Sequence, residues 1–228
     1  YPPARIEEML RAGVIDTVAL NLIEYRRMAR WLDPTTLFVD SASAKQQYTI
    51  LARAKEATDG SVSLAELRGK RLLVLRSPVM CVSPAWMASL LRPLEPAGMD
   101  RFFGSVALES KPARVLLPVF FGEADGCLTT MQTFLVISEL NPQLAKRLRP
   151  VAVSPGIVST LYAFRKGYGD ASRGRLARAL ATLPETPAGK QVLTMFQVEG
   201  LVEKDEGYLR ESLEILEQAD RGLREGQR

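Results

Sequence analysis

The sequence contains no histidine, and this absence removes several mechanisms at once. Histidine is the commonest general base and a common metal ligand, so Ser-His-Asp and Cys-His catalysis are excluded. Only two cysteines are present, Cys81 and Cys127, and they show no zinc-ligand spacing. We therefore expect no catalysis that depends on histidine and no structural zinc site, and no cofactor is implied.

Long apolar runs and basic clusters are also missing. No run of eighteen apolar residues occurs, so no membrane span is predicted. The opening residues YPPARIEEML lack the layout of a signal peptide, and we expect that any export signal has been removed. The net charge is only +4, and the basic residues are scattered without interleaved aromatics. Nucleic acid is therefore not an expected partner.

What the chain does contain is an alternation of strand and helix patterns. Strands are predicted at Val14–Leu20, Gln47–Ala54, Arg71–Leu75, Arg101–Leu108, Arg147–Ser154 and Thr160–Lys166, with one more inside Lys111–Thr130. Helices are predicted at Ala4–Gly13, Ile23–Leu32, Ala85–Leu94, Ser172–Leu183, Pro187–Phe196 and Glu206–Glu225. This alternation favours an α/β fold with mostly parallel sheets.

Two phrases are near duplicates, LRAGVIDTVAL and FFGEADGCLTT. In each, a glycine (Gly13, Gly122) ends a helix and an aspartate (Asp16, Asp125) opens an apolar strand. The repetition indicates two similar lobes, each with its own sheet.

The segment LVLRSPVMCVSPAWMASLL predicts a strand, a turn and a helix. Ser83 fits the N-cap position and Pro84 the first helical position. A helix N-terminus of this kind is a place where proteins bind anions, yet its turn carries Met80 and Cys81.

The sequence resembles the phosphonate-binding (PhnD-like) branch of the type II periplasmic solute-binding proteins. The resemblance rests on IEEMLRAGVIDTVALNLIEY, QQYTILARA, VSLAELRGKRLLVLRSPVMCVSP, ARVLLPVFFGEADGCLTTM and RPVAVSPGIVSTLYAFRK, in the family's order. It implies the type II periplasmic binding protein fold, with two lobes of mixed, mostly parallel sheets and a hinge of crossover strands. Lobe 1 would comprise residues 1–58 and 153–228, and lobe 2 residues 59–152. The family's first strand and helix have no counterpart ahead of Tyr1.

The resemblance also implies a periplasmic receptor rather than an enzyme. Such a protein captures a small solute in the cleft between its lobes. It then serves either an ABC permease or a membrane sensor histidine kinase of a two-component system.

Residue by residue, the implied ligand contacts depart from the family's pattern. Its anion-binding Ser-Thr-Ser turn falls on Met80, Cys81 and Val82, so three hydroxyls are lost while helix N-terminal amides around Pro78–Ser83 remain. The candidate ligand-binding residues are Asn21, Tyr48, Ser77, Met80, Cys81, Val82, Ser83, Thr129 and Thr130. The swap from hydroxyls to sulfur favours a thiophilic solute, such as arsenite or a sulfur compound. The alternative is an ABC-transporter receptor for phosphonate, phosphate or phosphite.

The two cysteines leave three interpretations open. Both could be small buried hydrophobes. A disulfide between Cys81 and Cys127 would close a loop of about 45 residues and stabilise the fold by about 3–4 kcal/mol in the chain-entropy model. A thiol of Cys81 facing the cleft would have a lowered pKa at the helix N-terminus and would bind a soft solute.

Overall fold

The computed structural model describes residues 1–41, 45–54, 62–196 and 198–225. The chain divides into two compact units. Unit 1 comprises Tyr1–Lys45 and Val158–Leu213, and unit 2 comprises Gln46–Ile157 and Glu214–Arg228.

The unit boundaries lie at other positions than the sequence indicated. The chain leaves unit 1 after Lys45 rather than near residue 58, because strand β3 (Tyr48–Arg53) pairs with β6 and β7, which both belong to unit 2. It returns after Ile157 and leaves again after Leu213, inside helix α10 (Arg210–Glu225). The stretch ATDGSVS (57–63) consists mostly of turn-forming residues and was expected to be a linker, but its residues 57–61 lie outside the described part of the chain.

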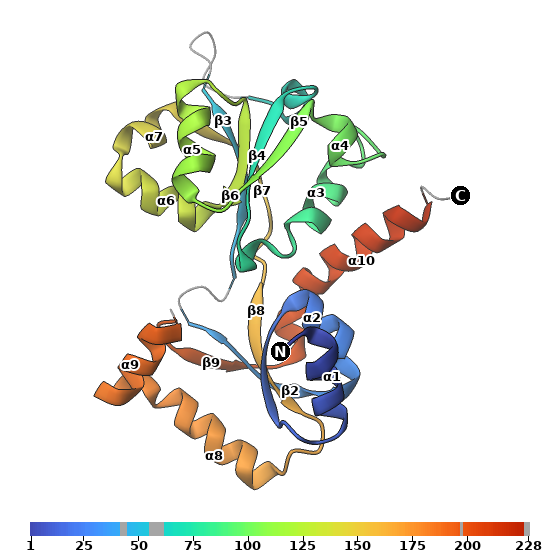
Figure 1. The fold of residues 1–228 in the computed structure, drawn as a ribbon, viewed down its shortest axis with the longest axis vertical. Coiled ribbons are helices and arrows are strands. Elements are labelled where there is room, and N and C mark those ends of the chain that lie inside the picture. The colour runs from blue at the N-terminus through green and yellow to red at the C-terminus, as the bar shows by residue number, and fades with distance from the viewer. Residues whose placement is uncertain (42–44, 55–61, 197, 226–228) are drawn as a thin grey trace. The chain divides into compact units, whose positions relative to one another are not determined.

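Unit 1 is built on a four-stranded sheet in the order β1-β8-β2-β9, and every pairing in it is antiparallel. Helices α1 and α2 lie on one side of this sheet and α8 and α9 on the other (Figure 1). The elements of this unit are α1 (Pro3–Arg11), β1 (Thr17–Asn21), α2 (Leu22–Met28), the 3₁₀ turn η1 (Ala29–Trp31), β2 (Leu32–Asp40), β8 (Thr160–Arg165), α8 (Asp170–Ala181), η4 (Leu183–Glu185), α9 (Pro187–Phe196), β9 (Leu201–Lys204) and η5 (Glu206–Leu209).

Strand β2 is the main element that the sequence patterns did not predict. The helix predicted to reach Leu32 ends at Met28, and the Asp33-Pro34 pair lies inside the strand. The register of β2 against β8 shifts between Leu32 and Leu37, which places the proline in an irregular part of the ladder. Proline is tolerated in a strand at such an irregularity.

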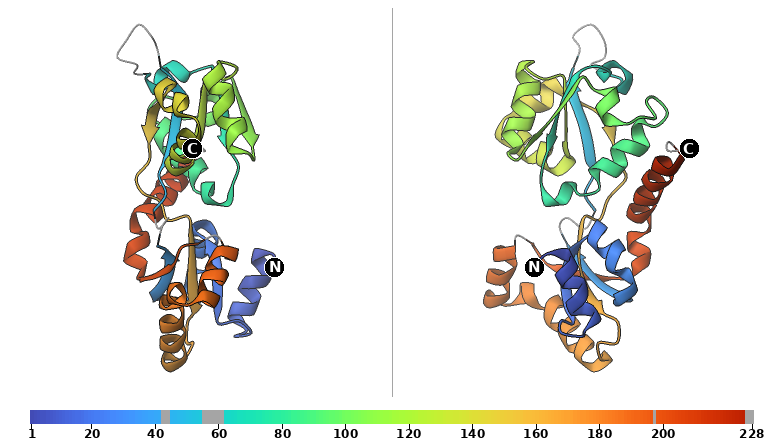
Figure 2. Two further views of the ribbon diagram at one scale, coloured as in Figure 1. Left: turned by 90° about the vertical axis from the view of Figure 1, so that its left-hand side faces the viewer. Right: turned by 45° about the vertical axis from the view of Figure 1, so that its right-hand side comes forward.

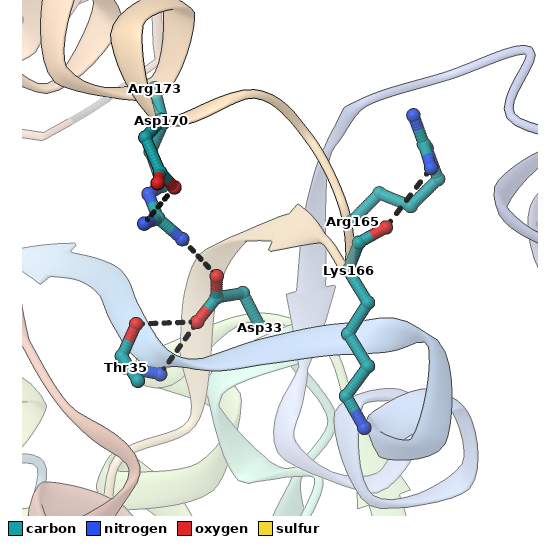
Figure 3. Close-up of polar contacts among 6 residues, drawn as sticks. All are labelled: Asp33, Thr35, Arg165, Lys166, Asp170 and Arg173. Carbon is teal, nitrogen blue, oxygen red and sulfur yellow. Dashed lines mark hydrogen bonds and ion pairs between the residues drawn. The ribbon is translucent and has the colours of Figure 1, made fainter.

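A polar network fixes this irregular segment (Figure 3). The Asp33 carboxylate accepts hydrogen bonds from the backbone N–H of Thr35 at 2.8 Å and from its hydroxyl at 2.6 Å, and it pairs with Arg173 of α8. Arg173 also donates to Asp170 at 2.7 Å. Burial alone would raise the pKa of Asp33, but these hydrogen bonds and the neighbouring cations lower it below its usual value.

Unit 2 contains a five-stranded sheet in the order β5-β4-β6-β3-β7. Strand β4 runs parallel to β5 and β6, whereas β3 runs antiparallel to β6 and β7. The sheet is mixed, as expected, but parallel pairing is confined to β4 and its two neighbours. The strands that enter and leave the unit, β3 and β7, supply the antiparallel part.

Helices α5, α6 and α7 cover one face of the unit 2 sheet, and α3 and α4 cover the other (Figures 1 and 2). The remaining elements of the unit are η2 (Leu64–Leu67), β4 (Arg71–Leu75), η3 (Pro78–Met80), α3 (Ser83–Leu91), α4 (Met99–Phe102), β5 (Ser105–Glu109), α5 (Pro112–Phe121), β6 (Gly126–Thr130), α6 (Met131–Leu140), α7 (Pro142–Arg147) and β7 (Leu148–Val153).

The two near-duplicate phrases form the same turn in the two units. Gly13 and Gly122 both adopt a left-handed conformation, with φ of 68° and 84°. At α5, the N–H of Glu123 bonds to the carbonyl of Pro118 and that of Gly122 to Val119, and α1 ends with the equivalent bonds. This is the Schellman pattern, in which a glycine closes a helix.

The aspartates of the two phrases then tie each turn to a neighbouring strand. Asp16 accepts from the guanidinium of Arg165 at 2.7 and 3.0 Å, and Asp125 accepts from the backbone N–H of Arg71 at 2.9 Å. The prediction that each glycine ends a helix and each aspartate opens a strand is confirmed.

Candidate functional site

The turn that follows β4 leads through η3 directly into α3. Val82 has helical angles of φ −91° and ψ −8° and occupies the N-cap position, so Ser83 is already the first residue of α3. The prediction that Ser83 caps the helix was therefore wrong by one position. The chain is already helical before Ser83, because the 3₁₀ turn runs almost without interruption into the α-helix.

Much of the turn's donor capacity is used within unit 2. The N–H of Met80 bonds to the carbonyl of Ser77 at 3.0 Å, and that of Cys81 to the carbonyl of Pro78 at 3.3 Å. Pro78 and Pro84 carry no N–H. The amides left to a ligand are thus fewer than the sequence pattern suggested.

The Tyr48 side chain fixes the backbone of this turn by a hydrogen bond. The side chain is fully buried, and its hydroxyl donates to the carbonyl of Val79 at 2.7 Å. Burial raises the pKa of Tyr48, and the adjacent Cys81 raises it further, whereas the backbone N–H of Val82 faces the hydroxyl and acts in the opposite direction. The hydroxyl therefore stays protonated and fills the inner side of the turn, where it fixes the backbone.

A cavity of about 220 Å³ opens between this turn, helix α3 and the sheet of unit 2. Its apolar walls come from Leu75, Met80, Met87, Met99, Leu108 and Leu128. Leu75, Leu108 and Leu128 lie in the last two thirds of the parallel strands β4, β5 and β6, so the cavity sits toward the carboxyl ends of these strands. Open α/β sheets bind their ligands at this edge.

The polar part of the cavity wall consists of Arg76, Ser77, Cys81 and Ser83. The Ser77 hydroxyl oxygen is shielded from solvent and has no hydrogen-bond partner among the described residues. Arg76 is exposed, and its side chain forms no ion pair within the part of the chain that the structure describes. A guanidinium and an unused hydroxyl at one edge of an apolar cavity suit an anionic group.

No disulfide joins Cys81 and Cys127, so that interpretation was wrong. Cys127 lies within β6, in register with Leu51 on one side and Leu73 on the other, whereas Cys81 lies in the turn beyond the end of β4. Cys127 is fully buried, and its burial raises the pKa of the thiol to about 12, as for an inert small hydrophobe. Cys81 is half-buried and lines the cavity.

The structure places the other candidate residues outside the cavity. Val82 is buried in the turn, and Thr129 is buried in β6 with its hydroxyl unpartnered among the described residues. The Thr130 hydroxyl caps α6 by accepting from the N–H of Thr133 at 3.0 Å. Ser77, Met80, Cys81 and Ser83 are thus the candidates that come together.

Asn21 belongs to unit 1 and caps helix α2. Its side-chain oxygen accepts from the N–H of Glu24 at 3.0 Å, and the Glu24 carboxylate accepts from the N–H of Asn21 at 3.1 Å. This reciprocal capping box occupies the side-chain oxygen. Tyr25 in the same helix is buried, and its hydroxyl donates to Glu206 at 3.0 Å.

Sequence reasoning missed Arg76, Met87 and Met99 as parts of the cavity wall. Arg76 directly follows β4, so its position at a carboxyl end was a signal that could have found it. The two methionines lie on α3 and α4, and no local pattern distinguishes a methionine that lines a cavity from one that packs in the core.

A second, larger cavity of about 940 Å³ lies at the other edge of the unit 2 sheet. Its wall includes Arg53, Lys70 and Lys146, and Lys70 precedes β4. It therefore sits at the amino end of β4 rather than at the carboxyl end, where ligands of such sheets bind.

Comparison of the sequence with protein families and comparison of the structure with solved structures point to the same group of proteins. The family described as "ABC transporter, phosphonate, periplasmic substrate-binding protein" matches residues 3–208. No match was found among curated proteins. In the described residues, no helix has the length and apolar character needed to cross a membrane.

Among solved structures, XAC2383 from Xanthomonas citri bound to ATP aligns with a TM-score of 0.67 and 17% identity, over 96% of this chain and 83% of that chain. PhnD1 from Prochlorococcus marinus in complex with methylphosphonate gives a TM-score of 0.62 and 14% identity, over 96% and 83%. PA3383 from Pseudomonas aeruginosa, a binding protein component of an ABC phosphonate transporter, gives 0.60 and 15%, over 96% and 74%. These likenesses establish the type II periplasmic binding protein fold.

Proposed function

The chain belongs to the family of periplasmic substrate-binding proteins of phosphonate ABC transporters, and we propose that it is a periplasmic receptor for a phosphorus oxyanion. In this proposal the oxyanion binds at the edge of the unit 2 cavity formed by Arg76, Ser77 and the start of α3. The receptor then delivers its solute to a membrane permease. The alternative ligand class inferred from the sequence, phosphonate, phosphate or phosphite, thus becomes the favoured one.

The observation that carries this proposal is the unused polar chemistry at the cavity edge. The Ser77 hydroxyl is unpartnered among the described residues, and Arg76 supplies a positive charge there. The N-terminus of α3, nine residues long, adds a favourable dipole for an anion. PhnD1 with methylphosphonate and XAC2383 with ATP share this fold and bind phosphorus oxyanions, which supports the same ligand class here.

Isothermal titration of the full chain with methylphosphonate, phosphite and phosphate tests the proposal. We expect at least one of them to bind and Arg76→Ala to weaken that binding by about tenfold or more, because a guanidinium pairs bidentately with such anions. Arg114→Ala is the matched control, since Arg114 is exposed on α5 of the same unit and does not line the cavity. Absence of heat with all three oxyanions would refute the proposal.

A second candidate function is a receptor for a thiophilic solute such as arsenite or thiosulfate. It is favoured by the sulfur atoms of Met80, Cys81, Met87 and Met99, which share the wall of one cavity. Thiolate and thioether groups prefer soft ligands. In that case Cys81→Ser weakens arsenite binding by about tenfold or more, and the oxyanions above give no heat.

Delivery to a sensor histidine kinase instead of a permease remains a second interpretation of either receptor. The description of the family names an ABC transporter, which favours the permease. Co-purification of the receptor with its membrane partner distinguishes the two.

A further inference from the structure

The cavity of unit 2 has room for far more than the oxygen atoms of an anion. Its volume is about 220 Å³, whereas an apolar cavity of about 150 Å³ is enough to hold a benzene molecule. An inorganic phosphate or phosphite held by Arg76 and Ser77 would leave most of this space unfilled.

The character of the wall indicates what enters that space. Met80, Met87 and Met99 present flexible, polarisable thioethers, and they adapt to apolar groups of differing shape. Met80 and Met87 are buried, so this part of the wall is shielded from water. A polar group placed deep among these side chains would lose its hydration without gaining a hydrogen bond.

Leu108 marks the mouth of the cavity. It lines the cavity from β5, yet 60% of its surface is exposed, unusually much for a leucine in a sheet. An apolar group of a ligand that passes this side chain would cover it and gain the free energy of removing both surfaces from water.

We propose that the solute of this receptor is an organic oxyanion with an alkyl or aryl substituent, whose substituent enters the cavity lined by Met80, Met87, Met99 and Leu108 while its oxyanion stays at Arg76 and Ser77. This inference rests on the proposed function and narrows it. Within the phosphonates that the family description names, it selects solutes whose substituent is apolar and has up to about six carbons.

A homologous series of ligands tests this on the full chain. We would titrate phosphate, phosphite, the n-alkylphosphonates from methyl to hexyl and phenylphosphonate by calorimetry at several temperatures. Affinity should rise about fourfold per added methylene until the cavity is full, at about 0.8 kcal/mol per methylene. The heat capacity change of binding should become more negative along the series, as burial of apolar surface requires.

A pair of leucine variants localises the effect. Leu108→Gln should weaken hexylphosphonate binding about fivefold and leave methylphosphonate within about twofold, because it removes apolar cover only from the substituent. Leu140→Gln is the matched control, since Leu140 is 81% exposed at the end of α6 and does not line the cavity. Both positions are largely solvent-exposed, so neither variant should impair folding.

The outcomes separate this inference from the proposed function. Equal affinities along the whole series would overturn the inference and leave the oxyanion receptor intact. Failure of every oxyanion to bind would overturn both. Binding of arsenite alone, lost in Cys81→Ser, would likewise overturn both and favour the thiophilic receptor.

Discussion

The Tyr48→Phe substitution tests the idea that a buried hydroxyl holds the turn after β4 in place. The change removes one oxygen from a side chain that has no exposed surface. The ring keeps its packing against Trp86, whose centroid lies 6.2 Å away, so the altered contact is the 2.7 Å bond to the carbonyl of Val79. That carbonyl then loses its partner at the base of the turn.

The expected loss in the free energy of unfolding depends on whether a buried hydrogen-bonding group keeps its partner. A satisfied hydrogen bond contributes about 1 kcal/mol net, but a buried group left without its partner costs about 1–3 kcal/mol. Taking about 2 kcal/mol and a urea dependence of about 2 kcal/mol per molar, the midpoint of unfolding of unit 2 should fall by about 1 M.

The assay is urea unfolding followed by the fluorescence of Trp86. The chain has two tryptophans, so a Trp31→Phe background leaves Trp86 as the reporter on unit 2. Tyr25→Phe is the matched control, because it removes an equally buried hydroxyl that donates to Glu206 within unit 1. A midpoint for Tyr48→Phe within about 0.2 M of the parent, or one shifted as much by Tyr25→Phe, would contradict the reasoning.

Three further predictions concern the rest of the molecule. Asp33→Asn should lower the free energy of unfolding at pH 7 by about 1.5–3 kcal/mol, the range for hydrogen bonds to a charged group. Folding lowers the pKa of Asp33 from its ordinary value of 3.8, so the carboxylate stabilises the fold above that pH and this stabilisation is lost as the pH falls further. A difference in stability between the variant and the parent that does not shrink on acidification would contradict this. Gly122→Ala should lower the free energy of unfolding in urea by about 1–2 kcal/mol, because φ at Gly122 is 84° and an added Cβ would lie 2.7 Å from the Arg53 guanidinium. Gly169→Ala should cost less, since φ at Gly169 is negative and an added Cβ would meet nothing within 4 Å. A thiol-specific reagent should react with both cysteines in the unfolded, unreduced chain. In the native protein it should react with Cys127 only after the fold opens locally, because Cys127 is fully buried. Absence of free thiols in the unfolded, unreduced chain would show that the two cysteines form a disulfide.

Much of the fold was readable from the sequence where one local signal decides the structure. Strand β4 and helix α9 begin and end at the predicted residues, and the turns at Gly13 and Gly122 form as expected. These positions depend on apolar patterning and on the left-handed conformation that glycine adopts readily. The misses arose where tertiary packing overrides the local signal, as at β2, where Asp33-Pro34 has the composition of a helix stop but lies in a strand bound by β8 and β9.

The site was predictable only in part, for the same physical reason. The turn after β4 was identified because the Ser83-Pro84 pair is typical of a helix N-terminus, where proteins bind anions. Its hydrogen bonds were not predictable, since the partner of Val79 is Tyr48, a residue on another strand. The methionines at positions 87 and 99 belong to the cavity only because α3 and α4 pack side by side over the sheet.

Tyr48 and the turn's own backbone satisfy several of the polar groups in the turn after β4. Tyr48 donates to the carbonyl of Val79, and the amides of Met80 and Cys81 bond to carbonyls of the same turn. These groups are therefore already hydrogen-bonded without a ligand, and fewer of them are left to bind an anion. If Arg76→Ala weakens oxyanion binding about tenfold, as expected, the ion pair at Arg76 contributes about 1.4 kcal/mol. Burial of a substituent contributes about 0.8 kcal/mol for each methylene. In the proposed receptor, three methylenes in the cavity would contribute about 2.4 kcal/mol and would therefore outweigh the charge, so the apolar part of the ligand would supply most of the free energy of binding.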